Sequence, residues 1–456
     1  MLQLAFMRKK PQLFGTDGVR GVAGHYPLDR ETVARLGCAL GTALAHEARS
    51  GSSEVLLGQD TRESSPWIVR ALAAGLRASG ARTVYAGVIT TPGLAFLTRQ
   101  RGFAAGVMVS ASHNPFEDNG IKVLSSEGTK LPEALELEIE DLLQSLPSVK
   151  FSEPELEPSP ELVNAYLDFL ESVAPHGDSI SRFHLVADCA HGASAAIIPE
   201  FLKRLGIEAR ILNAEPNGRN INLKCGSLHP QTMAEATRSA GADLGVAFDG
   251  DADRAIFASS SGQILDGDHV LFAMAPFLKS RQLLKGEAVV GTLMTNLGLE
   301  FALKRYTIGL KRTPVGDKFV LEEMQRSGIN LGGEPSGHII FSDISIAGDG
   351  IVTLLQMLRL LSETRAPADE LVREYKPFPQ IIRNVRVKAK PPFESIPEVA
   401  RALDLSRVYL GDRGRVVLRY SGTEPLARVM VEGEQMAIVE RHAAEIAEAI
   451  GKALGA

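Results

Sequence analysis

The chain has 456 residues, of which 45% are hydrophobic and 23% are charged, and its 49 basic and 55 acidic side chains leave a net charge of −6. This composition is typical of a folded globular protein and excludes disorder or a fibrous repeat over most of the chain. A mildly acidic chain offers no concentrated basic face for nucleic acid, and the longest apolar run, residues 270–278, is too short to cross a bilayer. We therefore expect neither a nucleic-acid partner nor a membrane partner.

Cysteine usage points to a reducing compartment. Cys38, Cys189 and Cys225 form no CxxC pair, and an odd number cannot close a full disulfide framework. At the N-terminus apolar residues precede the basic run 8–10, which is the reverse of a secretory signal. We expect a cytoplasmic protein, with about three domains from length alone.

Proline clusters and a polar turn divide the sequence into four segments, one more than its length suggests. Prolines cluster over residues 147–160 and again over 376–379, and a Ser-Ser-Ser-Gly turn occupies 259–262. Proline removes a backbone donor and fixes φ, so such stretches suit linkers. The predicted domains are 1–155, 156–258, 259–375 and 376–456.

The first three segments alternate short apolar strands with helices, in chain order. The predicted strands cover 54–58, 83–88, 104–109, 185–187, 244–248 and 288–290, and the predicted helices begin at 64–66 or cover 193–205 and 350–361. Such βα alternation predicts mostly parallel sheets with helices on both faces. The three segments have the same rhythm, but their sequence identity is too weak to prove duplication.

The last segment has a different pattern. Val385 and Val387 alternate with polar residues, 415–419 and 427–431 read as two further strands, and apolar residues recur at helical spacing over 439–454. We predict a small α+β domain with one open sheet face.

Three aspartates follow directly on the apolar segment 244–248. Side chains alternate along extended backbone, so Asp249, Asp251 and Asp253 can converge on one side. An EF-hand would require glycine and glutamate where this chain has Arg254 and Ser260. Because hard oxygen donors suit Mg²⁺, and ligands collect at the C-terminal ends of strands in open sheets, we predict a Mg²⁺ site. An acidic turn capped by its own aspartates is the alternative.

The segment Ser-Ala-Ser-His-Asn-Pro, residues 110–115, also follows an apolar strand. Neighbouring side chains point apart and a G-x-S-x-G elbow is missing, so a hydrolase triad of Ser112 and His113 is not expected. A loop serine can instead carry a phosphoryl group, whose charge of about −1.5 to −2 needs a metal or arginines nearby. A serine-rich turn ended by proline is the alternative. The turn at 119–122 places Lys122 near the same loop.

Three further loops carry polar side chains between glycines. Residues 332–338 could present Glu334, Ser336 and His338 to sugar hydroxyls, or be merely solvated. Residues 419–425, with Arg428, have the hydroxyls, glycine and arginines of a phosphate nest; the alternative is a hairpin with surface arginines. Residues 14–21 place Arg20 in a Gly-rich loop, which is a weak signal alone.

Together, in this order and one per segment, these motifs resemble the α-D-phosphohexomutase superfamily. The similarity runs from Phe14 to Gly433, and within the superfamily it is closest to the bacterial subgroup that acts on glucosamine phosphate. The segments that carry it are FGTDGVRG (14–21), SASHNPFEDNGIK (110–122), GTLMTNLGLE (291–300), RTPVGDK (312–318), GEPSGH (333–338) and SGTEPLARVMVEG (421–433). Pro335 stands where the subgroup usually has glutamine, and Tyr420 where lysine or proline is expected.

The resemblance implies an α/β fold of phosphohexomutase-like architecture, with three related mixed α/β domains and a small C-terminal α+β domain around a central cleft. It implies reversible conversion of glucosamine 6-phosphate to glucosamine 1-phosphate, feeding UDP-N-acetylglucosamine synthesis. A phosphoserine and one Mg²⁺ per active site would take part, with glucosamine 1,6-bisphosphate as intermediate or activator. It also allows a homodimer.

The resemblance also implies roles for individual residues. Ser112 would be the phosphoserine and would share the metal with Asp249, Asp251 and Asp253. Sugar contacts would come from Glu334, Ser336 and His338, and distal-phosphate contacts from Arg419, Ser421, Gly422, Thr423 and Arg428. Lys122 and His338 match positions proposed for proton transfer, and Arg20 and Arg254 match arginines of the cleft.

Three other functions are weighed against this one. Phosphomannomutase or phosphoglucomutase activity would use the same catalytic residues with another sugar. An aspartyl phosphatase with Asp249 as nucleophile requires D-x-D-x-[TV], whereas Arg254 follows Asp253 here. A sugar-phosphate sensor without catalysis should tolerate the loss of Ser112 or an aspartate, yet all are present.

Overall fold

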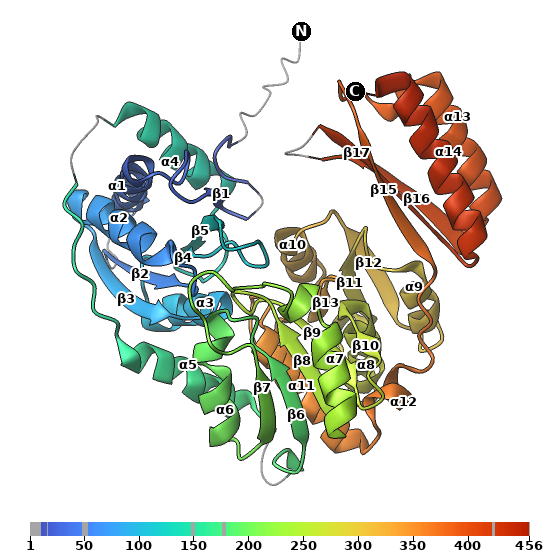
Figure 1. Cartoon of the computed structure of the whole chain (residues 1–456), viewed down its shortest axis with the longest axis horizontal. Helices are drawn as coiled ribbons and strands as arrows, with labels where there is room; N and C mark the ends of the chain where they lie inside the picture. The colour runs from blue at the N-terminus through green and yellow to red at the C-terminus, as the bar shows by residue number, and fades with distance from the viewer. Residues whose placement is uncertain are drawn as a thin grey trace.

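The computed structural model describes residues 11–15, 17–47, 53–146, 151–175, 179–421 and 425–455. Four sheets follow one another around an arc, with the first and fourth at its ends (Figure 1). None of the helices in the described part of the chain has the length and hydropathy of a membrane span.

The first three sheets share one topology. Each has four core strands in the spatial order fourth–third–first–second, and only the fourth runs antiparallel. These core strands are β2 (Glu54–Gln59), β3 (Arg82–Val88), β4 (Ala105–Val109) and β5 (Asp118–Ser125); β6 (His184–Asp188), β7 (Glu208–Leu212), β8 (Leu244–Phe248) and β9 (Ala255–Ser259); and β11 (Ala288–Thr292), β12 (Gly309–Thr313), β13 (Leu331–Gly333) and β14 (Ile339–Phe341). Because the order and direction repeat three times, the structure supports the duplication that sequence identity alone left unproven.

Edge strands distinguish the first two sheets. β1 (Val19–Val22) pairs with β5, and β10 (Ile264–Leu265) pairs with β9. The turn at 259–262, which the sequence analysis takes as a domain boundary, therefore connects two strands of one sheet. A boundary before residue 259 would leave β10 without its partner, so we place this boundary after β10.

Helices cover both faces of these sheets, as βα alternation predicts. They are α1 (Arg30–Glu47), α2 (Ser65–Ala78), α3 (Thr91–Arg101), α4 (Glu133–Ser145), α5 (Pro160–Val173), α6 (Ile198–Arg204), α7 (Gln231–Ala240), α8 (Gly267–Ser280), α9 (Leu297–Lys304), α10 (Asp317–Ser327), α11 (Gly350–Thr364) and α12 (Ala368–Val372). The predicted helix 193–205 is wrong in its first part. A 3₁₀ turn over Ala193–Ala196 precedes α6, because Pro199 lacks an N–H and fits only the first turn of a helix.

The fourth domain is an α+β domain, as predicted, with an antiparallel sheet and two helices, of which only the second was predicted. Its strands β15 (Gln380–Arg386), β17 (Leu426–Gly433) and β16 (Gly414–Tyr420) lie in that order, and α13 (Pro397–Leu410) and α14 (Met436–Leu454) pack with them. Val429, Val431, Ile446 and Ile450 are fully buried in its core. This core is separate from the others, whereas one continuous cluster joins the first three sheets through Leu56, Phe248 and Val289. The first three domains therefore form a shared frame.

Candidate active site

The predicted motifs occupy the same position in each domain. The turn between the third and fourth core strands carries residues 110–117, 249–254 and 334–338 in the first three domains, and 421–425 joins β16 to β17 in the fourth. The turns of the first three domains line a cavity of about 1270 Å³, and Arg428 on β17 lines it from the fourth domain. The predicted residues along it are Arg20, Asp253, Arg254, Glu334, His338 and Arg428.

Ser112 lies where the first and second domains meet, next to the lining residue His113. Its side chain is almost fully buried and donates to Asp249 Oδ2, with 2.5 Å between the oxygens. Its φ of 51° is the left-handed region, which non-glycine residues enter mainly at turns and functional sites. This turn also brings His113 Nδ1 to 3.2 Å from Ser112 Oγ, so the expectation that the two side chains point apart is wrong. Burial, followed by Arg254, lowers the pKa of His113 to about 4.

Two buried residues that were not predicted hold the loop of residues 110–115 in place. Asp60 and Arg62 form an ion pair of 2.8 Å at the end of β2, and Arg62 donates to the carbonyl of Ser112. Asp60 accepts from Ser110 Oγ, which in turn accepts from the Ser112 N–H. The position of the Gln-Asp-Thr-Arg segment directly after a predicted strand was the available signal.

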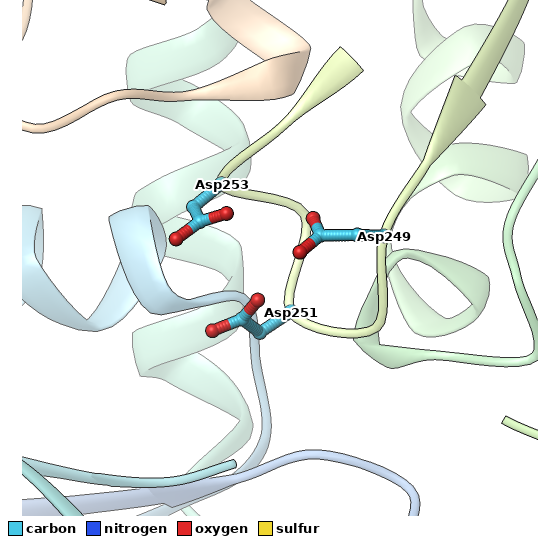
Figure 2. A group of neighbouring side chains, drawn as sticks. All are labelled: Asp249, Asp251 and Asp253. Carbon is cyan, nitrogen blue, oxygen red and sulfur yellow. The ribbon is translucent and has the colours of Figure 1, made fainter. Parts of the chain in front are cut away.

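The three aspartates converge as predicted (Figure 2). Each offers one carboxylate oxygen, and these oxygens lie within 4.8 Å of one another. One oxygen each of Asp251 and Asp253 is buried without a hydrogen-bond partner among the described residues, which is costly unless a cation binds there. Burial and the charge of Asp253 raise the pKa of Asp249 well above its usual value. The donor set and its unused oxygens therefore fit a hard divalent cation.

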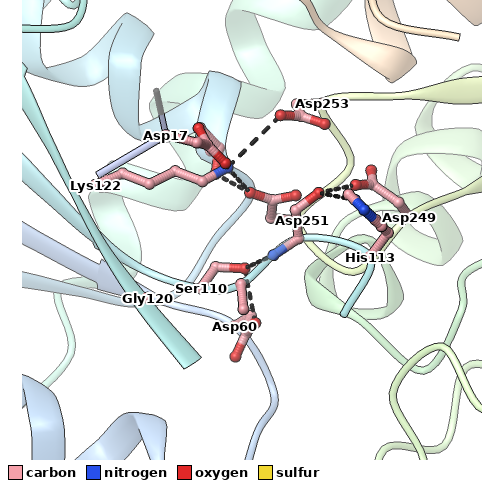
Figure 3. A network of polar contacts seen from close by, with 12 residues as sticks. Asp17, Asp60, Ser110, His113, Gly120, Lys122, Asp249, Asp251 and Asp253 are labelled. Atoms are coloured by element: carbon pink, nitrogen blue, oxygen red, sulfur yellow. Dashed lines mark hydrogen bonds and ion pairs between the residues drawn. The ribbon is translucent and has the colours of Figure 1, made fainter. Parts of the chain in front are cut away.

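Lys122 is the counter-ion of this acidic group. Its Nζ lies 2.7 Å from Asp251 and 3.6 Å from both Asp253 and Asp17 (Figure 3). Burial alone would lower the pKa of Lys122, but these three carboxylates raise it above its usual value. Burial likewise opposes ionisation of Asp253, whereas Lys122 and His338 hold the pKa of Asp253 well below its usual range. Asp17 was not predicted, and only the fold brings it here.

The third-domain loop places its polar side chains around the same cavity. His338 Nδ1 lies 3.7 Å from Asp253 Oδ2, and although burial opposes it, that carboxylate raises the pKa of His338 to about 9. Glu334 accepts from the Gly316 N–H at 3.0 Å. The hydroxyl of Ser336 is buried and has no hydrogen-bond partner among the described residues.

The predicted arginines come from three domains, and Arg20, Arg254 and Arg428 line the cavity. Arg20 donates to the carbonyl of Ala111 and pairs with Asp17. The backbone N–H of Arg254 donates to Asp249. Arg419 faces Arg428 across β16 and β17, and burial, together with the charge of Arg428, lowers the pKa of Arg419.

The predicted phosphate-binding loop, residues 419–425, lies only partly within the described residues. Lys390 donates to the carbonyl of Ser421, and Arg428 reaches the cavity. Arg419 is not among the described residues that line it. Gly422 and Thr423 lie outside the described residues, so their predicted roles stay predictions.

Comparisons with known proteins find similarity over nearly the whole chain. Models of the phosphoglucomutase/phosphomannomutase family match α/β/α domain I at residues 11–150, domain II at 164–262, domain III at 266–378 and the C-terminal domain at 383–449. A relative named phosphoglucosamine mutase from Koribacter versatilis is 49% identical, and the match covers 97% of each chain. Another of that name, from Solibacter usitatus, is 48% identical over 97% of this chain and 99% of the relative.

Solved structures share the fold. A putative phosphomannomutase from Thermus thermophilus has a TM-score of 0.78 at 25% identity, covering 97% of this chain and 99% of that one. An N-acetylphosphoglucosamine mutase from Aspergillus fumigatus, solved with GlcNAc-6P and magnesium, has a TM-score of 0.67 at 20% identity, covering 97% of this chain and 96% of that one.

Proposed function

The chain belongs to the phosphoglucomutase/phosphomannomutase family, whose members are isomerases that move a phosphoryl group, and we propose that it interconverts glucosamine 6-phosphate and glucosamine 1-phosphate. The observation that carries this proposal is the buried Ser112 hydroxyl, held 2.5 Å from Asp249 at the edge of the aspartate cluster. The relatives at 41–49% identity that are named phosphoglucosamine mutase support the amino sugar as substrate.

The proposed reaction has two transfers through Ser112. Phosphoserine 112 gives its phosphoryl group to the free 1- or 6-hydroxyl of the monophosphate, which forms glucosamine 1,6-bisphosphate and leaves a free serine. The bisphosphate turns over within the cavity and returns its other phosphoryl group to Ser112. Each transfer breaks one P–O bond and forms one, so phosphate is conserved over the cycle.

Mg²⁺ fits the aspartate cluster through Asp249, Asp251, Asp253 and an oxygen on Ser112, since two buried carboxylate oxygens have no hydrogen-bond partner among the described residues. When bound, it offsets the charge of phosphoserine and of the transferring group. Burial of Ser112 excludes water from the phosphoserine, which limits hydrolysis.

The proposed proton donors are Lys122 and His338. Both hold a proton in this arrangement, because their pKa values lie above the usual ranges. Each is therefore placed to give a proton to an oxygen that leaves, and to take one from an attacking hydroxyl only after doing so. Arg20 and Arg254 would stabilise the transferring charge from the cavity wall.

The substrate would span the cavity. Glu334, Ser336 and His338 would contact the sugar hydroxyls, and Arg428, with Arg419, Ser421, Gly422 and Thr423, would hold the phosphate that is not being transferred. We propose a cytoplasmic enzyme, in keeping with its three free cysteines. A homodimer stays a prediction.

The test follows labelled phosphate and sugar preference together. Protein carrying ³²P-phosphoserine should transfer label to glucosamine phosphate in a Mg²⁺-dependent manner, and Ser112→Ala should abolish both labelling and isomerisation. The surface variant Ser145→Ala is the control. Turnover by Ser112→Ala would contradict the serine mechanism, and label on Asp249 would indicate the phosphatase.

One coupled assay should compare glucosamine, glucose and mannose 6-phosphates. We expect the highest kcat/KM for glucosamine 6-phosphate. A clear preference for mannose 6-phosphate would overturn the substrate assignment while leaving the serine mechanism intact.

A further inference from the structure

One segment of the sequence motifs lies outside the cavity. Residues 291–300 end β11 and begin α9 in the third domain, next to the linker that leads into the fourth (Figure 1). The start of α9 is bonded to side chains from both the third and the fourth domain. This segment therefore has a role that the chemistry at Ser112 does not explain.

A buried carboxylate of the fourth domain accepts a hydrogen bond from the start of α9. Glu432, on β17, is fully buried, and its Oε1 accepts from the N–H of Leu297 at 2.5 Å. Its Oε2 accepts from Arg415 Nε at 2.7 Å, and Arg415 reaches on to the carbonyl of Thr295 at 2.5 Å. The first N–H of α9 thus finds its acceptor in another domain, at the positive end of the helix dipole.

The linker between the third and fourth domains, residues 373–379, is hydrogen-bonded to the same helix start. The Asn296 side chain donates to the carbonyl of Phe378 and accepts from the Phe378 N–H, at 3.0 and 2.9 Å. The backbone N–H of Asn296 donates to the buried Asp268 of α8. The anchor point therefore belongs rigidly to the third domain, and the linker and β17 are both tied to it.

β17 connects this anchor to the cavity. Glu432 and Arg428 lie on the same strand, four residues apart, which is about 14 Å of extended chain. A tilt of about 10° at Glu432 would therefore move Arg428 by roughly 2 Å, and a misplacement of about 1 Å is enough to weaken a binding contact strongly. Arg419 pairs with Arg428 in register and would move with it.

We propose that Glu432 and Arg415 are positioning residues: their clamp on the N-terminus of α9 sets the orientation of the fourth domain and so places Arg428 against the distal phosphate of the substrate. This inference rests on the proposed function for the identity of the substrate. The distal phosphate is bound in both the ground state and the transition state, so loosening the clamp weakens uniform binding, which raises KM rather than lowering kcat.

The experiment measures domain orientation and kinetics separately. Glu432→Gln keeps the size of the side chain but removes its charge, and Arg415→Lys keeps the charge but cannot reach Glu432 and Thr295 together. We expect both variants to raise KM for glucosamine 6-phosphate about tenfold, with kcat changed less than about threefold. Small-angle X-ray scattering without substrate should show a wider spread of fourth-domain orientations than in the unaltered protein.

The matched control is Glu434→Gln, two residues further along the chain, where the glutamate pairs with Arg413 at the surface. It should leave KM and scattering unchanged. Folded Glu432→Gln and Arg415→Lys proteins with unaltered scattering and unaltered KM would overturn the clamp. Failure of the proposed function would instead show as an unaltered protein without mutase turnover, and the scattering result would still stand.

Discussion

At the scale of single residues, the site depends on charges that are buried in pairs. Asp60 and Arg62 are both fully buried and satisfy each other, and Arg62 also donates to the carbonyls of Ser112, Asn114 and Pro115. A buried charge that loses its partner is far more costly than a pair removed together. The serine loop is therefore held by a buried ion pair that does not line the cavity.

Arg62→Met should unfold more easily by about 3–5 kcal/mol, because it leaves the buried carboxylate of Asp60 without a counter-ion. The double variant Asp60→Asn with Arg62→Met should recover part of this loss. Urea unfolding followed by the fluorescence of Trp67, the one tryptophan in the chain, reports on the first domain that holds the pair. Equal stability of Arg62→Met and the unaltered protein would contradict the structural role of the pair.

Residue chemistry was predictable where several polar groups follow one strand. Ser112 and the three aspartates are such cases, and the structure brings them together. Asp17 could not be found this way, because its partners Lys122 and Lys130 lie more than a hundred positions away and no local pattern relates them. The contact between Ser112 and His113 was missed because it depends on a positive φ that serine rarely adopts.

At the scale of elements, the start of α11 is capped by a buried carboxyl group whose pKa is raised. Asp349 caps it by accepting from the N–H groups of Ile351 and Val352, and it also accepts from the Tyr166 hydroxyl at 2.7 Å. Burial nevertheless raises the pKa of Asp349 from 3.8 to about 6. At neutral pH Asp349 therefore caps the helix as a carboxylate, and burying its charge costs stability.

The pH dependence of stability follows from this raised pKa. Between pH 3.8 and about 6 the folded protein holds a proton on Asp349 that the unfolded chain releases, so this carboxyl makes stability fall as pH rises through that window. Asp349→Asn, which still caps but does not titrate, should remove a loss of about 2 kcal/mol between pH 4 and pH 6.5. Chemical unfolding of both proteins across this range is the measurement, and parallel pH profiles would contradict the buried charge.

Most elements were predictable from hydrophobic period and from proline. The strands predicted at 54–58, 244–248 and 427–431 are examples, since each is an apolar run bounded by polar turns, and they correspond to β2, β8 and β17. The boundary at 259–262 was wrong because a polar turn looks the same whether it joins two strands of a sheet or two domains. Only the pairing of β9 with β10 separates these cases.

At the scale of the whole molecule, repetition explains the site. Each of the first three domains turns between its third and fourth strands at the shared cavity, so one loop position supplies the serine, the aspartates and the residues proposed to contact the sugar in turn. The continuous core of these domains fixes the loops relative to one another, whereas the fourth domain has its own core. Breaks in the sequence pattern predicted the four units and the resemblance implied a central cleft, but the continuous core that joins the first three domains required the structure.

Lys130 adds a direct ion pair between the first and third domains. Its Nζ lies 2.6 Å from Asp317 at the start of α10 and 3.5 Å from Asp17, which itself lies 3.6 Å from Lys122. Removing this cation should leave Asp17 to attract Lys122 away from Asp251. Lys130→Met should therefore lower kcat about tenfold, which corresponds to about 1.4 kcal/mol.

A double-mutant cycle tests whether this pair acts across the domains. Lys130→Met and Asp317→Asn share one interaction, so their combined loss in kcat should be smaller than the sum of the single losses, by about 1 kcal/mol. The control is Lys311→Met, which breaks a pair with Glu323 inside the third domain and should leave kcat unchanged. Strictly additive losses would show that Lys130 and Asp317 act independently, and the ion pair would then have no part in holding the first domain against the third.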